Sequence, residues 1–589
     1  MQLQVIALDY DGTIATDGAL DAEVRRAIVA AREQGVSVLL VTGRILADLE
    51  RLLVDLTLFD AIVAENGAVL HFPESRRSLL LAAPPADTFF TELRRREVPF
   101  LAGQCVVETD SGHAPAVLEA VRDTQQPLVL LFNRGRMMVL PQAVSKATGL
   151  REALRALRLS QHDAVGIGDA ENDHQLLAFC EIGAAVDWGS RALKAVADEI
   201  VPGDGPRAVA DYIRGLLREP NVAPERLGRR RVHLGVQGGG EPFDLALRGR
   251  NLLIAGDTQS GKSWVAGVLC EQLVLEHYTV CVIDPEGEYG TLERLPSVVV
   301  LDAEPTPPGL DDVERTLRYP DVSTVFDLSA MELDDKRVYV RELLRHLLDV
   351  RRRTGVPHRI VVDEAHYFLH DGTVPELLEL ESGGHTLVTW HATQLHPDVL
   401  AACQVIIATR VSDLDEARAL HALRGGDADF DAWFRTLSQL SQEQAALLPG
   451  AAESGDSLLR FRVSARLTPH ARHWLKYLNK RAPEGRAFVF AGDGGGGGRR
   501  AESLGELVEA LSKGPDLAGH LRRRDLSRWV RDVFDDRVLA NRLQSLEERW
   551  EEGRLERPHL AIIAAIRVRY GGDRGGLVLP VRERAAGTA

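Results

Sequence analysis

The sequence predicts an α/β protein with two successive parallel-sheet domains and a mostly helical C-terminal module. Three observations predict this fold class. Apolar segments of strand length alternate with amphipathic segments of helix length, polar or glycine residues directly follow several apolar segments, and the alternation stops near residue 470. At about 150 residues per domain, a chain of 589 residues suggests three or four folding units.

The first domain is predicted over residues 1–217. The segment VIALDY (5–10) is typical of a short buried strand, and DAEVRRAIVAAREQG (21–35) of an amphipathic helix that ends at Gly35. A second buried strand, VSVLLVTGR (36–44), follows, and the alternation returns at DAIVAENGAVL and DAVGIGD. This rhythm predicts a parallel sheet with helices on both faces.

The rest of the chain divides into three parts. Residues 218–230 hold two prolines among charges, which predicts a linker. A second strand series begins near 231 and predicts an α/β domain over 231–470; it includes NLLIAG, YTVCVID, HRIVVDEAH, HTLVTWHAT and QVIIATRV. Residues 471–589 are predicted to form a helical module of unknown role, in which Trp529, Val530 and Val533 have the helical spacing of packing residues. The five glycines at 494–498 predict a flexible loop.

Composition and charge exclude several classes of protein. With 45% hydrophobic and 26% charged residues, the chain can bury ordinary cores. No apolar run approaches the ~18 residues that span a bilayer, and the N-terminus lacks the basic region of a signal peptide, so we expect a cytoplasmic protein with no membrane partner. Five scattered cysteines predict neither disulfides nor a cysteine metal site. The net charge of −16 argues against a surface that binds nucleic acid throughout, but a local DNA-binding surface stays open.

Four short motifs in the first domain place polar residues at the ends of predicted strands. The motifs are residues 9–13 (DYDGT), 42–44 (TGR), Lys146 and 168–173 (GDAEND). Because the carboxyl ends of parallel strands share one edge of the sheet, the motifs are expected to meet there. Four carboxylates would then share one crevice: Asp9, Asp11, Asp169 and Asp173. Such crowding calls for a divalent cation, and an all-oxygen site suits Mg²⁺.

This set of residue types indicates phosphoryl chemistry. Asp9 can attack phosphorus and form an aspartyl-phosphate, and Asp11 can protonate the leaving group and then activate water. Thr42 and Lys146 can hold phosphoryl oxygens, and Gly43 and Asn172 are further candidates for phosphate binding. Lys146 is the more informative because the chain has only seven lysines among its 70 basic residues. Taken alone, DYDGT could also be a turn after a strand.

The ordered motifs resemble those of the haloacid dehalogenase superfamily. The resemblance implies that Asp9 is the nucleophile, that Asp11 is the acid/base, and that Asp169 and Asp173 complete the Mg²⁺ site with Asp9 and the backbone carbonyl of Asp11. Residues 65–68 (ENGA) and the length of the intervening segment are similar to Cof-like members with a C2-type cap, here over about 70–145, and to archaeal phosphoglycolate phosphatases. The substrate stays open; for the arginines 94–96 a solvated helix face is favoured over a contact with a second anionic group.

The second domain carries a P-loop motif, G-x-x-x-x-G-K-[ST], between a predicted strand and a predicted helix. Its residues are Gly256, Asp257, Thr258, Gln259, Ser260, Gly261, Lys262 and Ser263. The backbone N–H groups cradle phosphates, Lys262 reaches the β and γ oxygens, and Ser263 holds Mg²⁺. About a hundred residues later, Asp363 would hold the magnesium through water and Glu364 would polarise the attacking water, which favours ATP hydrolysis over kinase chemistry.

The second domain resembles ring-forming ATPases of the HerA/FtsK group over about residues 231–470. The resemblance rests on His233-Leu234-Gly235, on residues 283–289 (IDPEGEY) and on the polar residues that end later strands. It implies that Gln394 senses the γ-phosphate and that Arg410 reaches a neighbouring subunit's nucleotide, so a hexamer is expected. The chain departs from the group at residues 257–259 (DTQ), where a T-G pair is common.

Together these features predict a bifunctional protein: a Mg²⁺-dependent phosphatase acting on a small phosphorylated metabolite or nucleotide, joined to an ATP-hydrolysing domain. Two alternatives stay open. In one, the ATPase is a nucleic-acid translocase, with phage defence as one candidate role, and the first domain processes nucleotide or DNA-end phosphates. In the other, the ATPase ring is a scaffold or regulator of a metabolic phosphatase. A polynucleotide kinase is disfavoured by Glu364.

Overall fold

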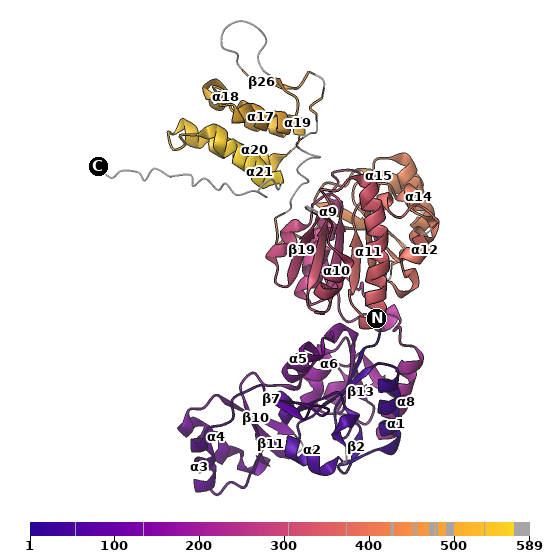
Figure 1. Ribbon diagram of the computed structural model, residues 1–589, viewed down its shortest axis with the longest axis vertical. Helices are drawn as coiled ribbons and strands as arrows, with labels where there is room; N and C mark the ends of the chain where they lie inside the picture. The colour runs from indigo at the N-terminus through magenta and orange to yellow at the C-terminus, as the bar shows by residue number, and fades with distance from the viewer. Residues whose placement is uncertain are drawn as a thin grey trace, which may run out of the picture. The chain divides into compact units, whose positions relative to one another are not determined.

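We describe the protein from a computed structural model (Figure 1). The described residues are 1–570 apart from 54, 134, 304–305, 373, 426–428, 452, 454, 456, 470–477, 479–480, 484, 491–499 and 535. The glycine run at 494–498 therefore lies outside the described residues. The chain forms two compact units. The first comprises Met1–Ile283, Leu295–Phe326 and Ala330–Leu467; the second comprises Asp284–Arg294, Asp327–Ser329 and the described residues from Thr468 onward. Among the described helices, none has the length and apolar character needed to span a membrane.

The first domain is built on an eight-stranded sheet. In spatial order its strands are β14 (Glu199–Val201), β13 (Ile182–Val186), β12 (Ala164–Gly168), β1 (Val5–Leu8), β4 (Ser37–Val41), β5 (Ala61–Ala64), β6 (Val69–Phe72) and β7 (Arg77–Leu80). The six strands from β14 to β5 are parallel, and β6 and β7 extend the sheet in antiparallel fashion. A two-stranded ribbon of β2 (Ala15–Thr16) and β3 (Ala19–Leu20) follows β1.

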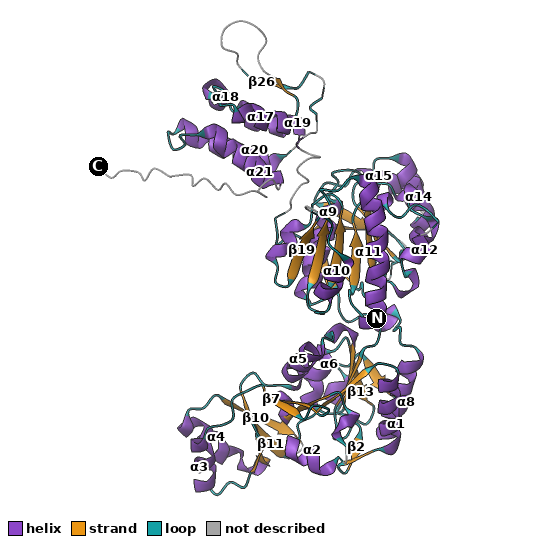
Figure 2. Cartoon of the chain, in the orientation of Figure 1, coloured by secondary structure: helices purple, strands orange, loops and turns teal. Residues whose placement is uncertain are grey.

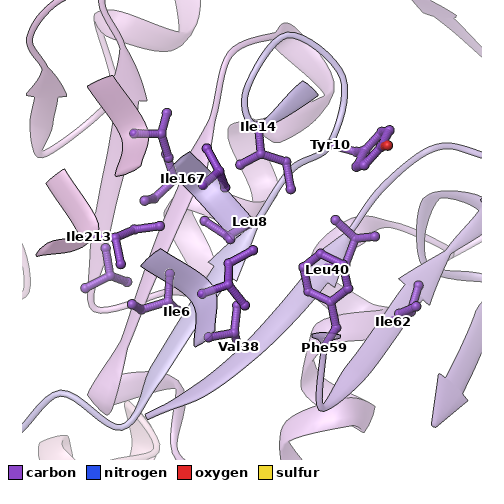
Figure 3. Close-up of a cluster of buried hydrophobic side chains, with 14 of the residues drawn as sticks. Ile6, Leu8, Tyr10, Ile14, Val38, Leu40, Phe59, Ile62, Ile167 and Ile213 are labelled. Carbon is purple, nitrogen blue, oxygen red and sulfur yellow. The ribbon is translucent and has the colours of Figure 1, made fainter. Parts of the chain in front are cut away.

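Helices cover both faces of this sheet, as the strand–helix alternation predicts (Figure 2). The helices of this domain are α1 (Ala22–Glu33), α2 (Leu46–Leu52), α5 (Lys146–Leu157), α6 (His174–Phe179), α7 (Arg191–Lys194) and α8 (Pro206–Arg218). Because side chains alternate along a strand, Ile6 and Leu8 of β1 pack on one face with α1 and α8, and Val5 and Ala7 pack on the other with α5 and α6. Figure 3 shows the first cluster, in which Ile213 of α8 approaches Ile6.

A smaller antiparallel sheet forms the cap. Its strand order is β10 (Leu128–Asn133), β11 (Arg136–Pro141), β9 (Val107–Asp110) and β8 (Leu101–Ala102), and α3 (Asp87–Arg95) and α4 (Ala114–Thr124) pack on it. The cap start near residue 70 that the sequence suggested falls within β6, which pairs with β5 in the larger sheet and not with the cap sheet. The cap sheet itself begins at Leu101.

The second domain has an eleven-stranded sheet whose central part is parallel. In spatial order its strands are β16 (Pro242–Leu245), β15 (Val232–Gln237), β25 (Leu459–Val463), β24 (Gln444–Leu447), β23 (Val405–Ala408), β17 (Leu252–Ala255), β22 (His385–Thr389), β21 (Arg359–Val362), β18 (Val280–Asp284), β20 (Ser323–Asp327) and β19 (Val298–Asp302). Its helices are α9 (Lys262–Leu275), α10 (Leu310–Leu317), α11 (Leu333–Thr354), α12 (Val374–Leu377), α13 (Pro397–Ala401), α14 (Leu414–Arg424) and α15 (Phe430–Ser438). β22 lies between the P-loop strand β17 and β21, so residues that follow these three strands share one edge.

The second unit contains the helical module. Its helices are α17 (Leu504–Ser512), α18 (Ala518–Arg523), α19 (Asp525–Phe534), α20 (Arg537–Glu551) and α21 (Pro558–Tyr570), with a short ribbon of β26 (Phe488–Val489) and β27 (Arg500–Ala501). Trp529 and Val530 of α19 are buried in its apolar core, which confirms that they are packing residues.

Candidate functional sites

The sheet order brings the motifs of the first domain together at one edge. Asp9 follows β1, Asp169 follows the neighbouring β12, and Thr42 follows the other neighbour, β4. Asp9, Thr42 and Asp169 are all at least 95% buried. The convergence is a consequence of parallel pairing, because each strand delivers its next residue to the same edge.

Lys146 stands at the centre of the acidic cluster. It is the first residue of α5, its side chain is fully buried, and its Nζ donates to Asp9 Oδ1 at 2.6 Å and to Asp173 Oδ1 at 2.5 Å. Burial alone would lower the pKa of Lys146, but the charges of Asp173 and Asp9 outweigh it and raise that pKa. Burial and the charge of Asp173 raise the pKa of Asp9 well above its ordinary value.

The residues of this cluster fit a magnesium ion. Carboxylate oxygens of Asp9, Asp169 and Asp173 lie within 4.8 Å of one another, and all three residues are buried. The backbone N–H groups of Asp169 and Ala170 both donate to Asp173 Oδ2 at 3.0 Å, and Asp173 Oδ1 accepts from Lys146, so both oxygens are held in place within the cluster. Three buried carboxylates with a single lysine leave negative charge that a hard divalent cation would neutralise.

The cluster opens into a pocket of about 380 Å³ between the sheet edge and the cap. The pocket is lined by Asp9, Asp11, Thr42, Gly43, Arg44, Asp48, Leu101, Glu108, Arg136, Met138, Asp169, Ala170 and Asn172. Of the predicted residues, Asn172 contributes a buried Oδ1 that has no hydrogen-bond partner, so it is available to a ligand. Asp11 does not point into the acidic cluster: both of its oxygens accept from Arg44.

Several residues with no role predicted from the sequence also shape this site. The buried carboxylate of Glu65 accepts the backbone N–H groups of Gln104 and Cys105 at 2.9 and 2.8 Å, which ties the cap to the sheet. Gly67 has φ +104°, and a Cβ added to Gly149 of α5 would lie only 2.6 Å from the Cα of Gly67. The two glycines therefore let α5 lie close to residues 65–67, and this position places Lys146 in the site. Glu65 and Gly67 both belong to the ENGA segment (65–68), which is the signal for these contacts in the sequence.

The P-loop lies after β17, where the sequence predicted it. α9 begins at Lys262, directly after Gly261, so its N-terminal N–H groups face the loop. Lys262 Nζ donates to the carbonyl oxygen of Asp257 at 2.8 Å, and Ser260 Oγ lies 2.5 Å from Thr409 Oγ1 after β23. Gln259 occupies the left-handed region at φ +62°, a conformation that costs a side-chain-bearing residue energy.

The other predicted ATP-site residues lie at the same sheet edge. Asp363 and Glu364 directly follow β21 and are buried, and Gln394 is exposed in the segment that follows β22. Arg410 Nε lies 3.5 Å from Asp257 Oδ2 of its own P-loop, and the Asp257 carboxylate also accepts from Ser412 N and Oγ. Arg410 therefore contacts the loop in its own chain, and its reach to a neighbouring subunit stays a prediction.

Within the first unit, the two α/β domains contact each other through buried polar residues. Asp163 directly precedes β12, and His358 directly precedes β21; His358 Nε2 lies 3.2 Å from Asp163 Oδ2. Arg248 Nη2 donates to Asp163 Oδ1 at 2.5 Å. A second contact between the domains is a hydrogen bond, in which the Tyr278 hydroxyl donates to Glu181 Oε1 of the first domain at 3.0 Å. All five residues are at least 91% buried.

The predicted linker takes part in this contact. Arg229 and Arg230 donate to carbonyl oxygens at the C-terminal end of α6, including Leu177 O and Phe179 O. Positive charge at a helix C-terminus is favourable because the helix dipole is negative there. Val222 N donates to Met1 O, so residues 218–230 pack along the first domain.

Comparisons with known proteins find relatives of both α/β domains. Residues 6–83 and 99–213 match the family of haloacid dehalogenase-like hydrolases, and residues 242–348 match the helicase HerA central domain. A phosphoglycolate phosphatase from Methanothermobacter thermautotrophicus is 30% identical over 223 residues, which cover 36% of this chain and 99% of that protein. Phosphoglycolate phosphatase 1 from Saccharolobus solfataricus is 25% identical over 223 residues, 37% of this chain and 96% of that protein. A solved haloacid dehalogenase-like hydrolase from Bacteroides thetaiotaomicron aligns with a TM-score of 0.34 and 19% identity over 36% of this chain and all of that chain.

The homologous phosphatases indicate that the first domain is a phosphoric monoester hydrolase, and the P-loop together with the match to the helicase HerA central domain indicates that the second is an ATPase. Through its N-terminal domain the chain belongs to the haloacid dehalogenase-like hydrolase family.

Proposed function

We propose that the first domain is a Mg²⁺-dependent phosphatase that forms an aspartyl-phosphate on Asp9. The observation that carries the proposal is the buried group of Asp9, Asp169, Asp173 and Lys146 beneath a capped pocket. An ion held by these carboxylates would orient the phosphate and offset its charge. Lys146 and Thr42 would hold phosphoryl oxygens while an oxygen of Asp9 attacks phosphorus.

The substrate is proposed to be a small phosphorylated metabolite or nucleotide, because the pocket of about 380 Å³ lies in the range of small-molecule sites. The relatives named phosphoglycolate phosphatase make 2-phosphoglycolate one compound to include in a substrate panel. All five cysteines are buried and unpaired, which supports a reducing compartment such as the cytoplasm.

Two reciprocal variants test the assignment of the two activities. Asp9→Asn should abolish phosphate release from phosphomonoesters and leave ATP hydrolysis intact, and Lys262→Ala should do the reverse. Asp211→Asn and Lys513→Ala are matched controls, since both side chains are at least half exposed. Chelation of divalent cations should stop phosphomonoester hydrolysis, and added Mg²⁺ should restore it. Unchanged phosphomonoester hydrolysis by Asp9→Asn would show that the proposed nucleophile is wrong.

For the second domain we propose an ATP-hydrolysing ring, with a hexamer as the expected assembly. The match to the HerA central domain and the intact P-loop support this proposal. Sedimentation with and without ATP measures the assembly. A nucleic-acid translocase should show ATP hydrolysis that DNA stimulates, with DNA affinity falling steeply as salt rises. ATP hydrolysis that is indifferent to DNA at low salt would argue against this role.

A regulatory ATPase is the second candidate, and the buried contact between Asp163 and both Arg248 and His358 favours it. Phosphomonoester hydrolysis should then change when ATP is added to the wild-type chain but not to Lys262→Ala. Equal rates with and without ATP in both proteins would exclude regulation of this kind.

A further inference from the structure

Another pocket of the first unit shares no residue with either proposed catalytic site. Its volume is about 390 Å³, within the range of about 300–1,000 Å³ that is usual for sites that bind small organic molecules. Its walls come from residues 178 and 196 of the first domain, from residues 229–232 between the domains, and from the second domain. We call it the junction pocket.

Five guanidinium groups line the junction pocket, and the lining contains a single carboxylate, that of the exposed Glu276. The guanidinium groups belong to Arg229, Arg230, Arg231, Arg248 and Arg359. Four of them contact carboxylates that are not part of the lining: Arg229 pairs with Asp198, Arg230 with Glu181, Arg231 with Glu453, and Arg248 with Asp163. The wall of the pocket is therefore strongly positive, because the balancing carboxylates lie outside it.

Two of these arginines are buried with fewer acceptors than their charge calls for. Arg359 donates to three carbonyl oxygens and to the Thr386 hydroxyl, and none of these acceptors is charged. Burial and the charges of Arg351 and Arg248 lower the pKa of Arg359 to about 9. Arg248 donates to Asp163 through Nη2, but its buried Nε has no hydrogen-bond partner in the described part of the chain. Because buried positive charge is costly without a counter-charge, an anion in the pocket would stabilise this arrangement.

The lining also indicates the kind of anion. Guanidinium groups bind phosphoryl oxygens in pairs, and several guanidinium groups around one space suit the multiple oxygens and the double negative charge of a phosphoryl group. The remaining wall is apolar, since Val232, Leu247 and Leu273 line the pocket and are buried. An organic part of a ligand would pack against these side chains, which a bare phosphate ion would leave uncovered.

We propose that the junction pocket binds a small organic phosphate, with its phosphoryl group among the arginines and its apolar part against Val232, Leu247 and Leu273. Such a ligand would contact both α/β domains and the residues that connect them. Binding uses neither the phosphatase chemistry nor ATP hydrolysis, so this proposal stands or fails separately from the proposed function.

Three probes separate the parts of the proposal. Phenylphosphonate carries a phosphonate on an apolar ring and is not a phosphate ester, inorganic phosphate has only the anion, and benzyl alcohol has only the ring. Calorimetric titration of the full chain is carried out in EDTA, because both catalytic sites are proposed to bind phosphate with Mg²⁺. We expect one phenylphosphonate per chain, bound about tenfold or more tightly than inorganic phosphate because the ring is buried, and no saturable binding of benzyl alcohol.

Variants show where the probe binds. Arg231→Gln, at a side chain that is 43% exposed, should weaken phenylphosphonate binding about tenfold, because one charge-assisted hydrogen bond is lost, and Arg359→Gln should weaken it at least as much. Arg250→Gln is the matched control and should leave the affinity unchanged: Arg250 contacts the same Glu453 carboxylate at 3.5 Å but does not line the pocket. Lys146→Met and Lys262→Ala alter the two catalytic sites and should also leave the affinity unchanged.

Several results would overturn the proposal. These are the absence of saturable phenylphosphonate binding, equal affinity for inorganic phosphate, and unchanged binding in both Arg231→Gln and Arg359→Gln. Loss of binding in Lys146→Met or Lys262→Ala would place the probe in a catalytic site and would overturn it as well. Circular dichroism shows whether each variant is folded, and Arg231→Gln decides the question if the buried Arg359→Gln does not fold.

Discussion

The substitution Arg248→Met tests whether the buried contact between the two α/β domains stabilises the fold. Arg248 and Asp163 form an ion pair at 2.5 Å, with side chains that are 6% and 0% exposed. Removing one partner of a buried pair leaves an uncompensated charge, which costs about 3–5 kcal/mol. Burial already raises the pKa of Asp163 to about 6, and without Arg248 the carboxyl can take up a proton. Proton uptake by Asp163 limits the destabilisation, so we expect Arg248→Met to lower the free energy of unfolding by about 3 kcal/mol at pH 7.

A double-mutant cycle gives this expectation its control. Asp163→Leu alone should also destabilise the protein, because Arg248 is then buried without its carboxylate. The double variant Arg248→Met/Asp163→Leu leaves no charge unpaired. Its loss in free energy of unfolding should therefore be about 2 kcal/mol smaller than the sum of the two single losses. Arg155→Met is the matched control: it breaks an exposed pair with Glu152, 66% and 43% exposed, and should cost less than about 0.5 kcal/mol.

Urea unfolding at pH 7, followed by circular dichroism, measures these differences. If Arg248→Met and Arg155→Met shift the transition equally, the Asp163 contact contributes no more than a surface pair. Strict additivity in the double variant would show that the two side chains do not interact across the contact. Either result would refute the reasoning from burial and distance.

Three further outcomes follow from the structure. Lys146→Met should lower kcat for phosphomonoesters about 100- to 1,000-fold with unchanged ATP hydrolysis, as measured by phosphate release, because one preorganised charge is lost. Gln259→Gly should leave the free energy of unfolding unchanged or raise it by up to about 1 kcal/mol in thermal unfolding, whereas Gln259→Val should lower it, because φ is +62° there. Burial alone would raise the pKa of Glu181, but the hydrogen bond with His162 outweighs it and brings that pKa to about 2. The ionised Glu181 carboxylate therefore adds to the free energy of unfolding above pH 4.5, and this contribution is lost toward pH 2. The difference in free energy of unfolding between wild type and Glu181→Gln should shrink by about 3 kcal/mol over that range.

The sequence predicted the residues at the strand ends because chemistry and topology coincide there. Asp9, Thr42 and Asp169 each follow a run of apolar residues, and parallel pairing brings the ends of such runs together whatever the other details. The same argument placed Asp363 at the sheet edge that carries the P-loop. The argument does not depend on side-chain contacts, so it can be made from the sequence alone.

The cap contribution could not be predicted in this way. An antiparallel strand has no special end, so nothing in the segment that contains Glu108 and Arg136 marks it as facing phosphate chemistry. The more conspicuous arginines 94–96 proved to belong to the surface of the cap: Arg96 pairs with Glu119 at 2.6 Å and with Asp123 at 2.5 Å. The pairing of Arg44 with Asp11 is likewise invisible in TGR, because it depends on how two loops from different strands face each other.

The contact between the domains shows a second limit. Asp163 and His358 are polar residues directly before buried strands, and polar residues at strand starts are common enough that they give no sign of a partner. In the structure they meet each other, and the strands that they precede, β12 and β21, are followed by Asp169 and by Asp363. The residues that precede these two strands are therefore in direct contact, and the residues that follow the strands are the proposed magnesium ligands of the two sites. Under the proposed regulation of the phosphatase by the ATPase, a displacement of either strand along its axis would reach the other strand through these buried, hydrogen-bonded groups.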